Sequence, residues 1–244
     1  MKAVILAAGR GSRLGHYTTD IPKTLNKVAQ KSIIEYIISS LKSAGINHVI
    51  IISGYQSHLL NQYADTMIIN EEWASTNMVA SLLCAKQFFS ENLIISYSDV
   101  IYSSETVMSL KNQKKDIVVP YYLGWKKLWE MRFSDPLSDL ESFCINQEGS
   151  ILDIGQKVNA FNDIQGQFMG ILRFTPRAFG WIEQYLSSKK KDIAQMDMTT
   201  LLRGLIAKGH SLHGMPVNDL WMEIDNPKDL QLANKYFLTL NSSE

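Results

Sequence analysis

The chain has 244 residues, with 24 lysine and arginine side chains against 24 aspartate and glutamate side chains, so its formal net charge is zero. This balance argues against a general nucleic-acid binder, which carries a basic excess, and against an acidic tail. We therefore expect small molecules as partners and no nucleic acid. Hydrophobic residues make up 45% of the chain and charged residues 20%, which are ordinary values for one compact globular domain.

The apolar runs of the chain are short. The run at 49–52 is far below the ~18–20 residues that span a bilayer, and the N-terminus begins a strand pattern rather than a signal peptide. Cys84 and Cys144 form neither a CxxC pair nor a zinc spacing, which suits a reducing compartment. We expect a cytoplasmic protein without a membrane partner.

Over the first 120 residues, short apolar strands alternate with helices. The first strand, 2–6, enters a glycine-rich loop. The next element is a helix with apolar residues at helical spacing, a capping box of Ser32 with Glu35, and Gly45 at its end. We then expect strands at 48–53, 65–69, 93–97 and 117–119, and helices at 79–89 and from about 104. This alternation predicts an α/β fold with a parallel sheet, which binds ligands at the carboxyl ends of its strands.

The alternation stops at about residue 121. From there to about 165 the chain carries Trp125, Trp129 and Phe133 between polar stretches, and we expect an insertion or flap within a single domain of residues 1–244. After it we expect a strand at 166–174, helices that begin at Pro176 and Met198, a strand at 221–224, and a last helix that begins at Asn226-Pro227.

The strongest chemical signal is the loop from Leu6 to Leu14, LAAGRGSRL, with Pro22-Lys23 shortly after it. Small residues let the backbone approach a ligand closely, and successive amides form a concave site for phosphate oxygens. Arg13 and Lys23 add the positive charge that a triphosphate needs. The alternative interpretation is a tight strand-to-helix turn with solvated basic side chains.

Two other phosphate motifs do not fit this loop. A Walker loop needs GxxxxGK[ST], and the sequence has none. A dinucleotide fingerprint needs GxGxxG, but Leu14 stands where the third glycine is required. The loop therefore argues against an oxidoreductase.

The pattern LAAGxGxRL followed by PK resembles the signature of nucleotidyltransferases that join an NTP to a phosphorylated small molecule. The resemblance runs over nearly the whole chain and implies a Rossmann-like, GT-A-like α/β three-layer sandwich with a mostly parallel mixed sheet. Gly54-Tyr55, the stretch 70–82 and Glu223-Ile224-Asp225 are similar to the cytidylyltransferases that act on choline phosphate in bacterial surface decoration. The segments 129–141 and 163–167 resemble the phosphoglutamine cytidylyltransferase of capsule phosphoramidate synthesis.

The resemblance implies a CTP-dependent enzyme that transfers CMP to phosphoglutamine, phosphocholine or a phosphonate with release of pyrophosphate, for capsule or cell-surface polysaccharide modification. It implies catalytic roles for Arg13, Lys23, Asp99 and Asp225. The nucleotide-binding residues that it implies are Leu6, Ala7, Ala8, Gly9, Gly11, Ser12, Arg13, Lys23, Gly54, Tyr55, Asn77, Ser81 and Ser98. For Asn77, at the start of a predicted helix, an N-cap role is the alternative.

Asp99 and Asp225 are the candidate metal ligands. Each follows an apolar strand, so both can reach one rim of a parallel or mixed sheet. Mg²⁺ prefers one or two carboxylates with phosphate oxygens and water, and in the family the matching residues hold this ion. The alternative is a strand-end cap for Asp99 and a helix cap for Asp225.

The inserted segment is where we expect the acceptor pocket. The resemblance suggests Trp129, Arg132, Asp163 and Gln167 as its binding residues. Aromatic rings surround a quaternary ammonium well, whereas an arginine or a glutamine suits a carboxylate or an amide. Core packing under the flap is the alternative for each tryptophan.

Two other functions stay open at this point. A sugar-1-phosphate nucleotidyltransferase that uses another NTP shares the loop, the lysine and the metal. A non-catalytic nucleotide-binding regulatory module needs no lysine at the α-phosphate, so the joint presence of Lys23, Asp99 and Asp225 argues against it. For an enzyme, an acceptor phosphate of about −1.5 to −2 charge needs no general base, which leaves positioning and charge neutralisation as the means of catalysis.

Overall fold

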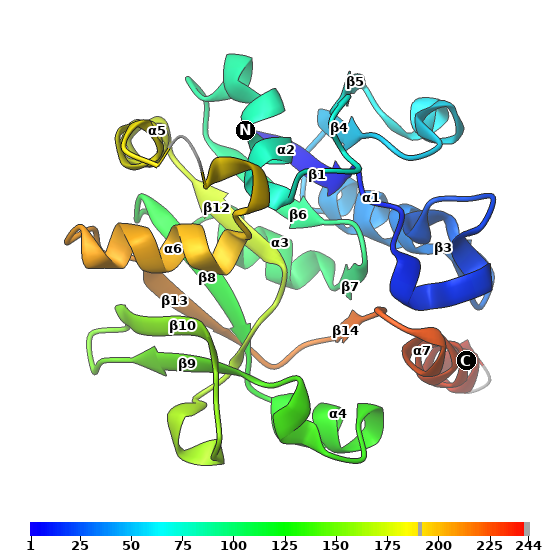
Figure 1. Cartoon of the computed structure of the whole chain (residues 1–244). Coiled ribbons are helices and arrows are strands. Elements are labelled where there is room, and N and C mark those ends of the chain that lie inside the picture. Colours follow the sequence, from blue (N-terminus) through cyan, green and yellow to red (C-terminus); the bar gives the residue numbers. More distant parts are fainter. Residues whose placement is uncertain (190–191, 242–244) are drawn as a thin grey trace.

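The computed structural model describes residues 1–189 and 192–241. Its centre is an eight-stranded sheet in which β6, β1, β4 and β5 lie side by side and run parallel (Figure 1). The strands of this sheet are β1 (Lys2–Ala7), β4 (Val49–Ser53), β5 (Thr66–Ile69), β6 (Leu93–Tyr97), β8 (Ile117–Tyr122), β11 (Gln167–Phe168), β12 (Ile171–Phe174) and β13 (His213–Val217).

The other half of the sheet is mixed. β12 lies between β6 and β8 and runs antiparallel to both, and β11 is likewise antiparallel to β8. β13 pairs with β8 in parallel. Within the described residues, the sheet is therefore mostly parallel, as the sequence predicts.

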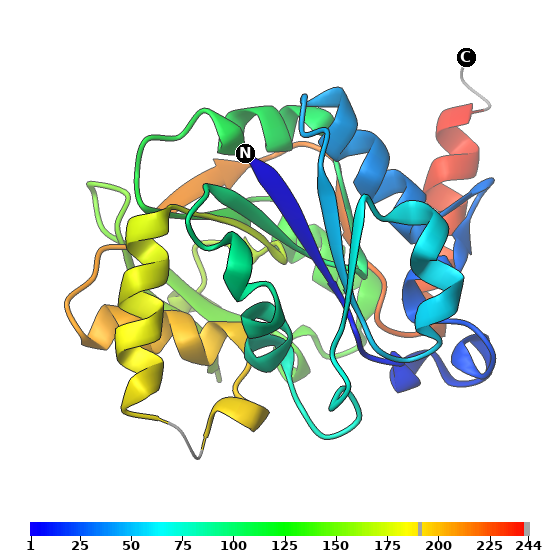
Figure 2. The same cartoon turned by 90° about the horizontal axis from the view of Figure 1, so that it is seen from above.

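Helices cover both faces of the sheet (Figure 2). Ala3 and Ile5 of β1 belong to one buried apolar cluster, and Val4 and Leu6 to the other, because successive strand residues point to opposite faces. The first cluster includes side chains of α1 (Ile33–Ser43), α3 (Ser104–Lys111), α4 (Trp125–Arg132) and α7 (Pro227–Asn241). The second includes side chains of α2 (Met78–Cys84), α5 (Pro176–Ser187) and α6 (Met198–Ala207). This is the predicted three-layer α/β sandwich.

The helix limits follow the local sequence signals closely. Glu35 accepts from the backbone N–H of Ser32 at 2.7 Å, which completes the predicted capping box, and Gly45 ends α1 with φ of +76°. Thr175 caps α5 by accepting from Ala178 N at 3.3 Å. These elements begin and end where the chain itself supplies the hydrogen bonds that a helix terminus lacks.

Two elements differ from the prediction. The helix expected at 79–89 ends at Cys84, and a separate 3-10 turn (Lys86–Phe88) follows it. The next residue, Phe89, stacks on the ring of Phe179. The strand expected at 166–174 is broken into β11 and β12 at Gly170, which has φ of +69°. In both places tertiary packing overrides local periodicity.

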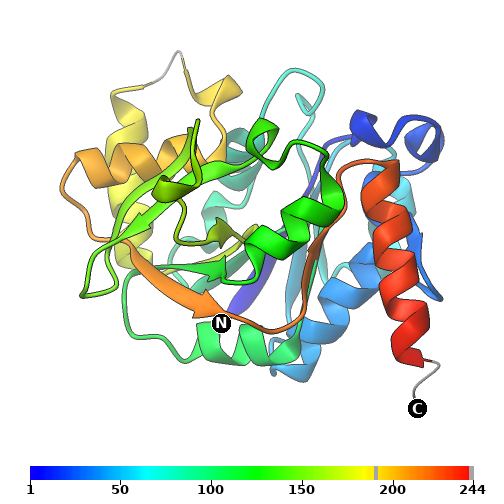
Figure 3. The same cartoon turned by 90° about the horizontal axis from the view of Figure 1, so that it is seen from below.

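The segment expected as an insertion leaves the sheet after Tyr122, the last residue of β8. It contains α4 and the antiparallel pair β9 (Glu141–Ile145) and β10 (Ile151–Lys157). Figure 3 shows α4 beside α7, and the β9–β10 pair beside α6. Two further short pairs are β2 (Lys27–Val28) with β3 (Lys31–Ser32), and β7 (Val100–Tyr102) with β14 (Trp221–Glu223). Across the described part of the chain, no helix combines the length and the apolar character needed to cross a membrane.

Candidate active site

The loop that follows β1 is built around Gly11. Its φ of +76° lies in the left-handed region that favours glycine. A Cβ added there would lie 2.5 Å from Cβ of Lys23 and 2.8 Å from its Cδ, so the loop backbone packs directly on that side chain. Leu14 in the following 3-10 turn is fully buried and anchors the loop to the core. The glycine-rich loop and Lys23 therefore form one structural unit.

Gly11→Ala should lower the free energy of unfolding by about 1–3 kcal/mol, because alanine is strained at this φ and its methyl group meets Lys23. Gly9→Ala is the matched control, since a Cβ at Gly9 would meet nothing within 4 Å. Urea unfolding of the two variants checks the prediction. Equal loss of stability in both variants would contradict it.

Lys23 bridges two carboxylates. Its Nζ lies 2.6 Å from Oδ2 of Asp99 and 2.8 Å from Oδ1 of Asp225, and the three side chains are 8%, 11% and 8% exposed. Arg13 approaches the same Asp225 oxygen at 2.8 Å from an exposed position. Two cations and two carboxylates therefore balance one another in charge.

A short two-stranded sheet, and not the main sheet, brings the two aspartates together. Asp99 directly precedes β7, and Asp225 follows β14 after one residue. β7 and β14 pair antiparallel with Val100 opposite Glu223, and Ile224 donates its backbone N–H to the carbonyl oxygen of Asp99 at 2.8 Å. The expectation that both carboxylates meet is thus correct, but the shared rim of one sheet is not the reason.

The surrounding charges favour the ionised forms of Lys23 and Asp225. Burial works to lower the pKa of Lys23, but the charges of Asp99 and Asp225 outweigh burial and raise this pKa above its usual value. Burial works to raise the pKa of Asp225, and the nearby charges of Lys23 and Arg13 nevertheless hold it below its usual range. Lys23 and Asp225 therefore keep their charges at neutral pH.

The side chain of Arg132 is buried close to Asp225. Its side chain is 1% exposed, and its guanidinium contacts both oxygens of Asp229 at 3.0 and 3.1 Å and Glu223 at 2.8 Å. The guanidinium nitrogen Nη2, which contacts Asp229, also lies 3.7 Å from Asp225. The structure thus does not place Arg132 in the expected acceptor site, because carboxylates of the C-terminal segment already occupy its donors.

A cavity of about 260 Å³ is lined by the glycine-rich loop and by the ends of neighbouring elements. It brings together most of the residues that were expected to bind a nucleotide, together with Asp99. These residues are Leu6, Ala8, Gly9, Gly11, Ser12, Arg13, Lys23, Asn77, Ser81 and Ser98. Trp73, Thr76, Met78 and Tyr97, which were not assigned to the nucleotide, complete its wall.

Three expected nucleotide residues do not line this cavity. Ala7 points into the core with 2% exposure. Gly54 makes room for the ring of Trp73, because a Cβ at Gly54 would lie 2.4 Å from Cβ of the tryptophan. Tyr55 contacts the edge of Trp73 and donates its hydroxyl to the carbonyl oxygens of residues 18 and 19. Trp73, rather than Tyr55, therefore lines the cavity.

Asn77 and Ser81 combine structural and cavity positions. The side chain of Asn77 caps α2 by accepting from Met78 N at 2.8 Å and donates to the carbonyl of Gln195 at 3.3 Å. Ser81 accepts from Asn70 at 3.1 Å. The alternative N-cap interpretation of Asn77 is thus confirmed, and the residue still lines the cavity.

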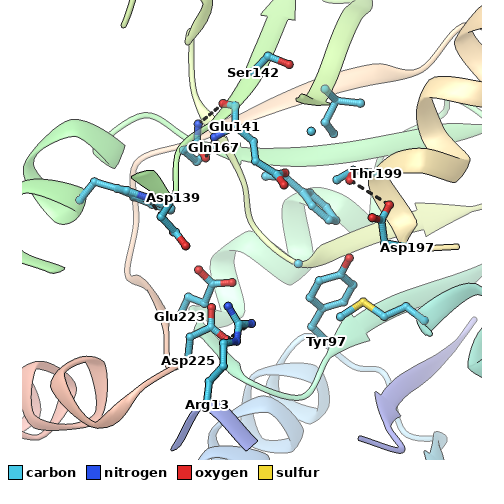
Figure 4. Close-up of a pocket in the computed structure, with 16 residues that line it drawn as sticks. Arg13, Tyr97, Asp139, Glu141, Ser142, Gln167, Asp197, Thr199, Glu223 and Asp225 are labelled. Atoms are coloured by element: carbon cyan, nitrogen blue, oxygen red, sulfur yellow. Dashed lines mark hydrogen bonds and ion pairs between the residues drawn. The ribbon is translucent and has the colours of Figure 1, made fainter. Parts of the chain in front are cut away.

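A second cavity of about 290 Å³ adjoins the first and shares Arg13, Met78 and Tyr97 with it (Figure 4). Aromatic rings of Tyr97, Trp129 and Phe168 form part of its wall. Five carboxylate side chains also line it, and Figure 4 shows them arranged around one space: Asp139, Glu141, Asp197, Glu223 and Asp225. Among the described residues that line this cavity, Arg13 supplies the positive charge.

Two of the expected acceptor residues, Trp129 and Gln167, line this second cavity. Trp129 donates its ring N–H to Asp139 at 3.1 Å, and the amide of Gln167 donates to the carbonyl of Glu141 at 2.6 Å. Gln167 therefore holds the cavity wall in place. Asp163 lies at the end of a 3-10 turn, and its side chain is outside the described part of the structure.

We call the five carboxylates that line the second cavity the acidic wall. Their proximity was not predicted from the sequence. Burial and the charge of Asp225 raise the pKa of Glu223 to about 8, against the opposing effect of Arg132. Burial also raises the pKa values of Asp139 and Glu141. The five carboxylates of the cavity come from three distant segments, so no local pattern joins them, although all except Asp197 lie in segments that carry the family resemblance.

A family model for the MobA-like NTP transferase domain matches residues 3–189. The chain belongs to this family. It is therefore a nucleotidyltransferase.

Individual relatives support the same conclusion, and a solved structure shares the fold. The chain is 35% identical to a CTP:phosphoglutamine cytidylyltransferase from Campylobacter jejuni, over 95% of this chain and 98% of the relative. It is 38% identical to a choline-phosphate cytidylyltransferase from Streptococcus pneumoniae over 43% of this chain and 47% of that one. A solved structure of a putative glucose-1-phosphate thymidylyltransferase from Bacillus anthracis shares the fold, with a TM-score of 0.75, 21% identity, and coverage of 97% and 94%.

Proposed function

We propose that this enzyme transfers CMP from CTP to a small phosphorylated acceptor and releases pyrophosphate. The observation that carries the proposal is the cluster of Lys23, Arg13, Asp99 and Asp225 at the junction of two adjoining cavities. One cavity has the glycine-rich loop of a nucleotide site and the other has room for an acceptor. The activities of the two cytidylyltransferase relatives favour CTP and acceptors such as phosphoglutamine, phosphocholine or a phosphonate.

In this proposal the first cavity holds CTP. Backbone amides around Gly9 and Gly11 bind phosphate oxygens, since a run of amides in such a loop forms a concave anion site. Trp73, Asn77 and Ser81 line the same cavity, where the base and ribose would contact them. Ser98 lines the cavity beside Asp99.

The residues present fit a magnesium ion. Oδ1 of Asp99 is buried and has no hydrogen-bond partner in the described structure, so this is an acceptor that a bound cation could satisfy. Within residues 1–189 and 192–241, no three His, Cys, Asp or Glu side chains form a metal-binding group, so phosphate oxygens and water would complete the ligands of Asp99 and Asp225. When bound, the metal would neutralise phosphate charge.

An oxygen of the acceptor phosphate attacks the α-phosphorus in line, and the bond from that phosphorus to the oxygen of the β-phosphate breaks. The electron pair leaves with pyrophosphate. Because the acceptor phosphate is already an anion, no side chain needs to remove a proton. Lys23 offsets charge that grows at the α-phosphate, and Arg13 offsets charge on the leaving pyrophosphate.

The acidic wall of the second cavity favours an acceptor with an ammonium group. Glu141, Asp139 and Asp197 would face the positively charged end of the acceptor, while its phosphate points to Arg13 and Lys23. The ring of Trp129 adds a surface on which a cation binds well. Phosphocholine, 2-aminoethylphosphonate and phosphoglutamine all carry such a group. The product would serve capsule or cell-surface modification, and the reaction would take place in the cytoplasm.

A pyrophosphate-release screen tests this proposal. CTP, UTP, GTP and ATP are each offered with Mg²⁺ and phosphocholine, 2-aminoethylphosphonate, phosphorylated glutamine or sugar 1-phosphates. We expect release with CTP and an ammonium-bearing acceptor. Release with sugar 1-phosphates and another NTP would instead support a sugar nucleotidyltransferase, and CTP binding without release under any condition would support a regulatory module.

A further inference from the structure

The ammonium group of Lys23 lies between the two carboxylates that a divalent cation would use. It contacts Asp99 at 2.6 Å and Asp225 at 2.8 Å. All three side chains are about nine-tenths buried, so solvent weakens these ion pairs little. A lysine ammonium and a divalent cation cannot occupy this place together, because both are positive and neither would be screened by water.

Lys23 can yield its place only by moving the far end of its side chain. Its Cβ and Cδ pack against the backbone of Gly11, and its own backbone lies in a 3-10 turn (Lys23–Leu25) that Pro22 precedes. The side chain also lines the first cavity. The ammonium group can therefore move into this cavity, where nucleotide phosphates would lie.

The energetics make this movement depend on the nucleotide. If a metal ion displaced Lys23 with no nucleotide present, the ammonium would lose both carboxylates and gain no anion in exchange, which is unfavourable. With a triphosphate in the cavity, the ammonium exchanges carboxylates for phosphate oxygens. The charge on Asp99 and Asp225 is then free for the metal.

We propose that Lys23 is a resident counter-ion that closes the Asp99–Asp225 pair to metal until nucleotide phosphate draws its ammonium away. Nucleotide and metal then bind with positive coupling, and by thermodynamic linkage each strengthens the other. This proposal rests on the proposed function in one respect, namely that the anion in the first cavity is a nucleoside triphosphate. Lys23 thereby acts in site assembly as well as at the α-phosphate.

The test measures Mn²⁺ binding in the absence of nucleotide. Electron paramagnetic resonance monitors the free Mn²⁺ ion during the titration. Removal of the competing ammonium in Lys23→Met should tighten Mn²⁺ binding by about ten- to a hundredfold over wild type, the range of typical coupling free energies. Lys23→Arg keeps the charge and should bind as weakly as wild type. Lys86→Met, which removes an exposed lysine paired with Glu183, is the matched control and should also leave binding unchanged.

The double variant Lys23→Met/Asp99→Asn locates the site, because it should lose the gain. If Lys23→Met binds Mn²⁺ no more tightly than wild type, or if the gain survives in the double variant, the proposal is wrong. Circular dichroism verifies that each variant folds. Neither result requires turnover, so an enzyme that fails the CTP screen still answers this question.

A second measurement uses the wild-type protein alone, in case Lys23→Met does not fold. A ¹H–¹⁵N spectrum of the lysine ammonium groups should show the Lys23 signal, since its ammonium is buried in ion pairs. We expect Mg²⁺ alone to leave this signal in place, and CTP with Mg²⁺ to shift it. Displacement of the signal by Mg²⁺ alone, at concentrations stoichiometric with the protein, would overturn the proposal.

Discussion

Asp99→Asn is expected to lower kcat by about 10²- to 10³-fold with CTP, Mg²⁺ and the acceptor found in the screen, the loss that follows removal of one preorganised electrostatic group. The asparagine keeps the shape of the side chain but removes the negative charge. Lys23 then loses one of its two carboxylates, and the proposed metal loses the orphaned oxygen of Asp99. Steady-state pyrophosphate release measures the effect.

The control for this change is Asp219→Asn, which removes an exposed carboxylate from the loop between β13 and β14. It should retain wild-type turnover. Full turnover in Asp99→Asn would show that this carboxylate has no part in the reaction, and would remove the catalytic role assigned to it.

Arg132→Met is expected to lower the free energy of unfolding by about 3–5 kcal/mol, because it leaves buried carboxylates without their counter-ion. Arg132 pairs with Glu223 and Asp229 and lies near Asp225, and its own side chain is 1% exposed. Lysine in its place would keep the charge but lose the two-point contact with Asp229. The free energy of unfolding of Arg132→Lys should therefore lie between those of the wild type and Arg132→Met. Urea unfolding of the purified proteins gives the values.

Arg177→Met is the matched control for this prediction. Arg177 is also an arginine paired with an aspartate, Asp116, but its side chain is 73% exposed and the separation is 3.6 Å. Loss of such a surface pair should cost about 0–1 kcal/mol. If the two methionine variants lose similar stability, the buried cluster around Arg132 is not what holds the C-terminal segment to α4.

Much of the fold could be predicted because its signals are local. β1 and β6 are mostly apolar runs, and Ser32, Gly45 and Thr175 mark helix limits that the structure reproduces within a few residues. The break at Gly170 could not be predicted, because Tyr97 of the neighbouring β6 donates to its carbonyl oxygen and fixes the bend.

The candidate site likewise has a part that could be predicted from local sequence and a part that could not. The glycine-rich loop with Arg13 and Lys23 is one compact stretch of sequence, and most of its expected residues line the first cavity. Arg132 and Tyr55 were assigned to ligands, but their donors are directed to protein groups. A side chain's hydrogen-bond partners depend on segments distant in the chain, and no spacing rule supplies them.

The sequence alone determined the α/β class, the nucleotidyltransferase family resemblance, and the presence of a local cationic loop within a neutral chain. These properties depend on periodicity, composition and short motifs. Only the tertiary structure decided that β7 pairs with β14 and brings Asp225 to Asp99, and that five carboxylates from distant segments surround the second cavity. Long-range pairing and burial fix where charges meet, and the interaction of charges depends on their separation and solvent exposure, which a linear sequence does not contain.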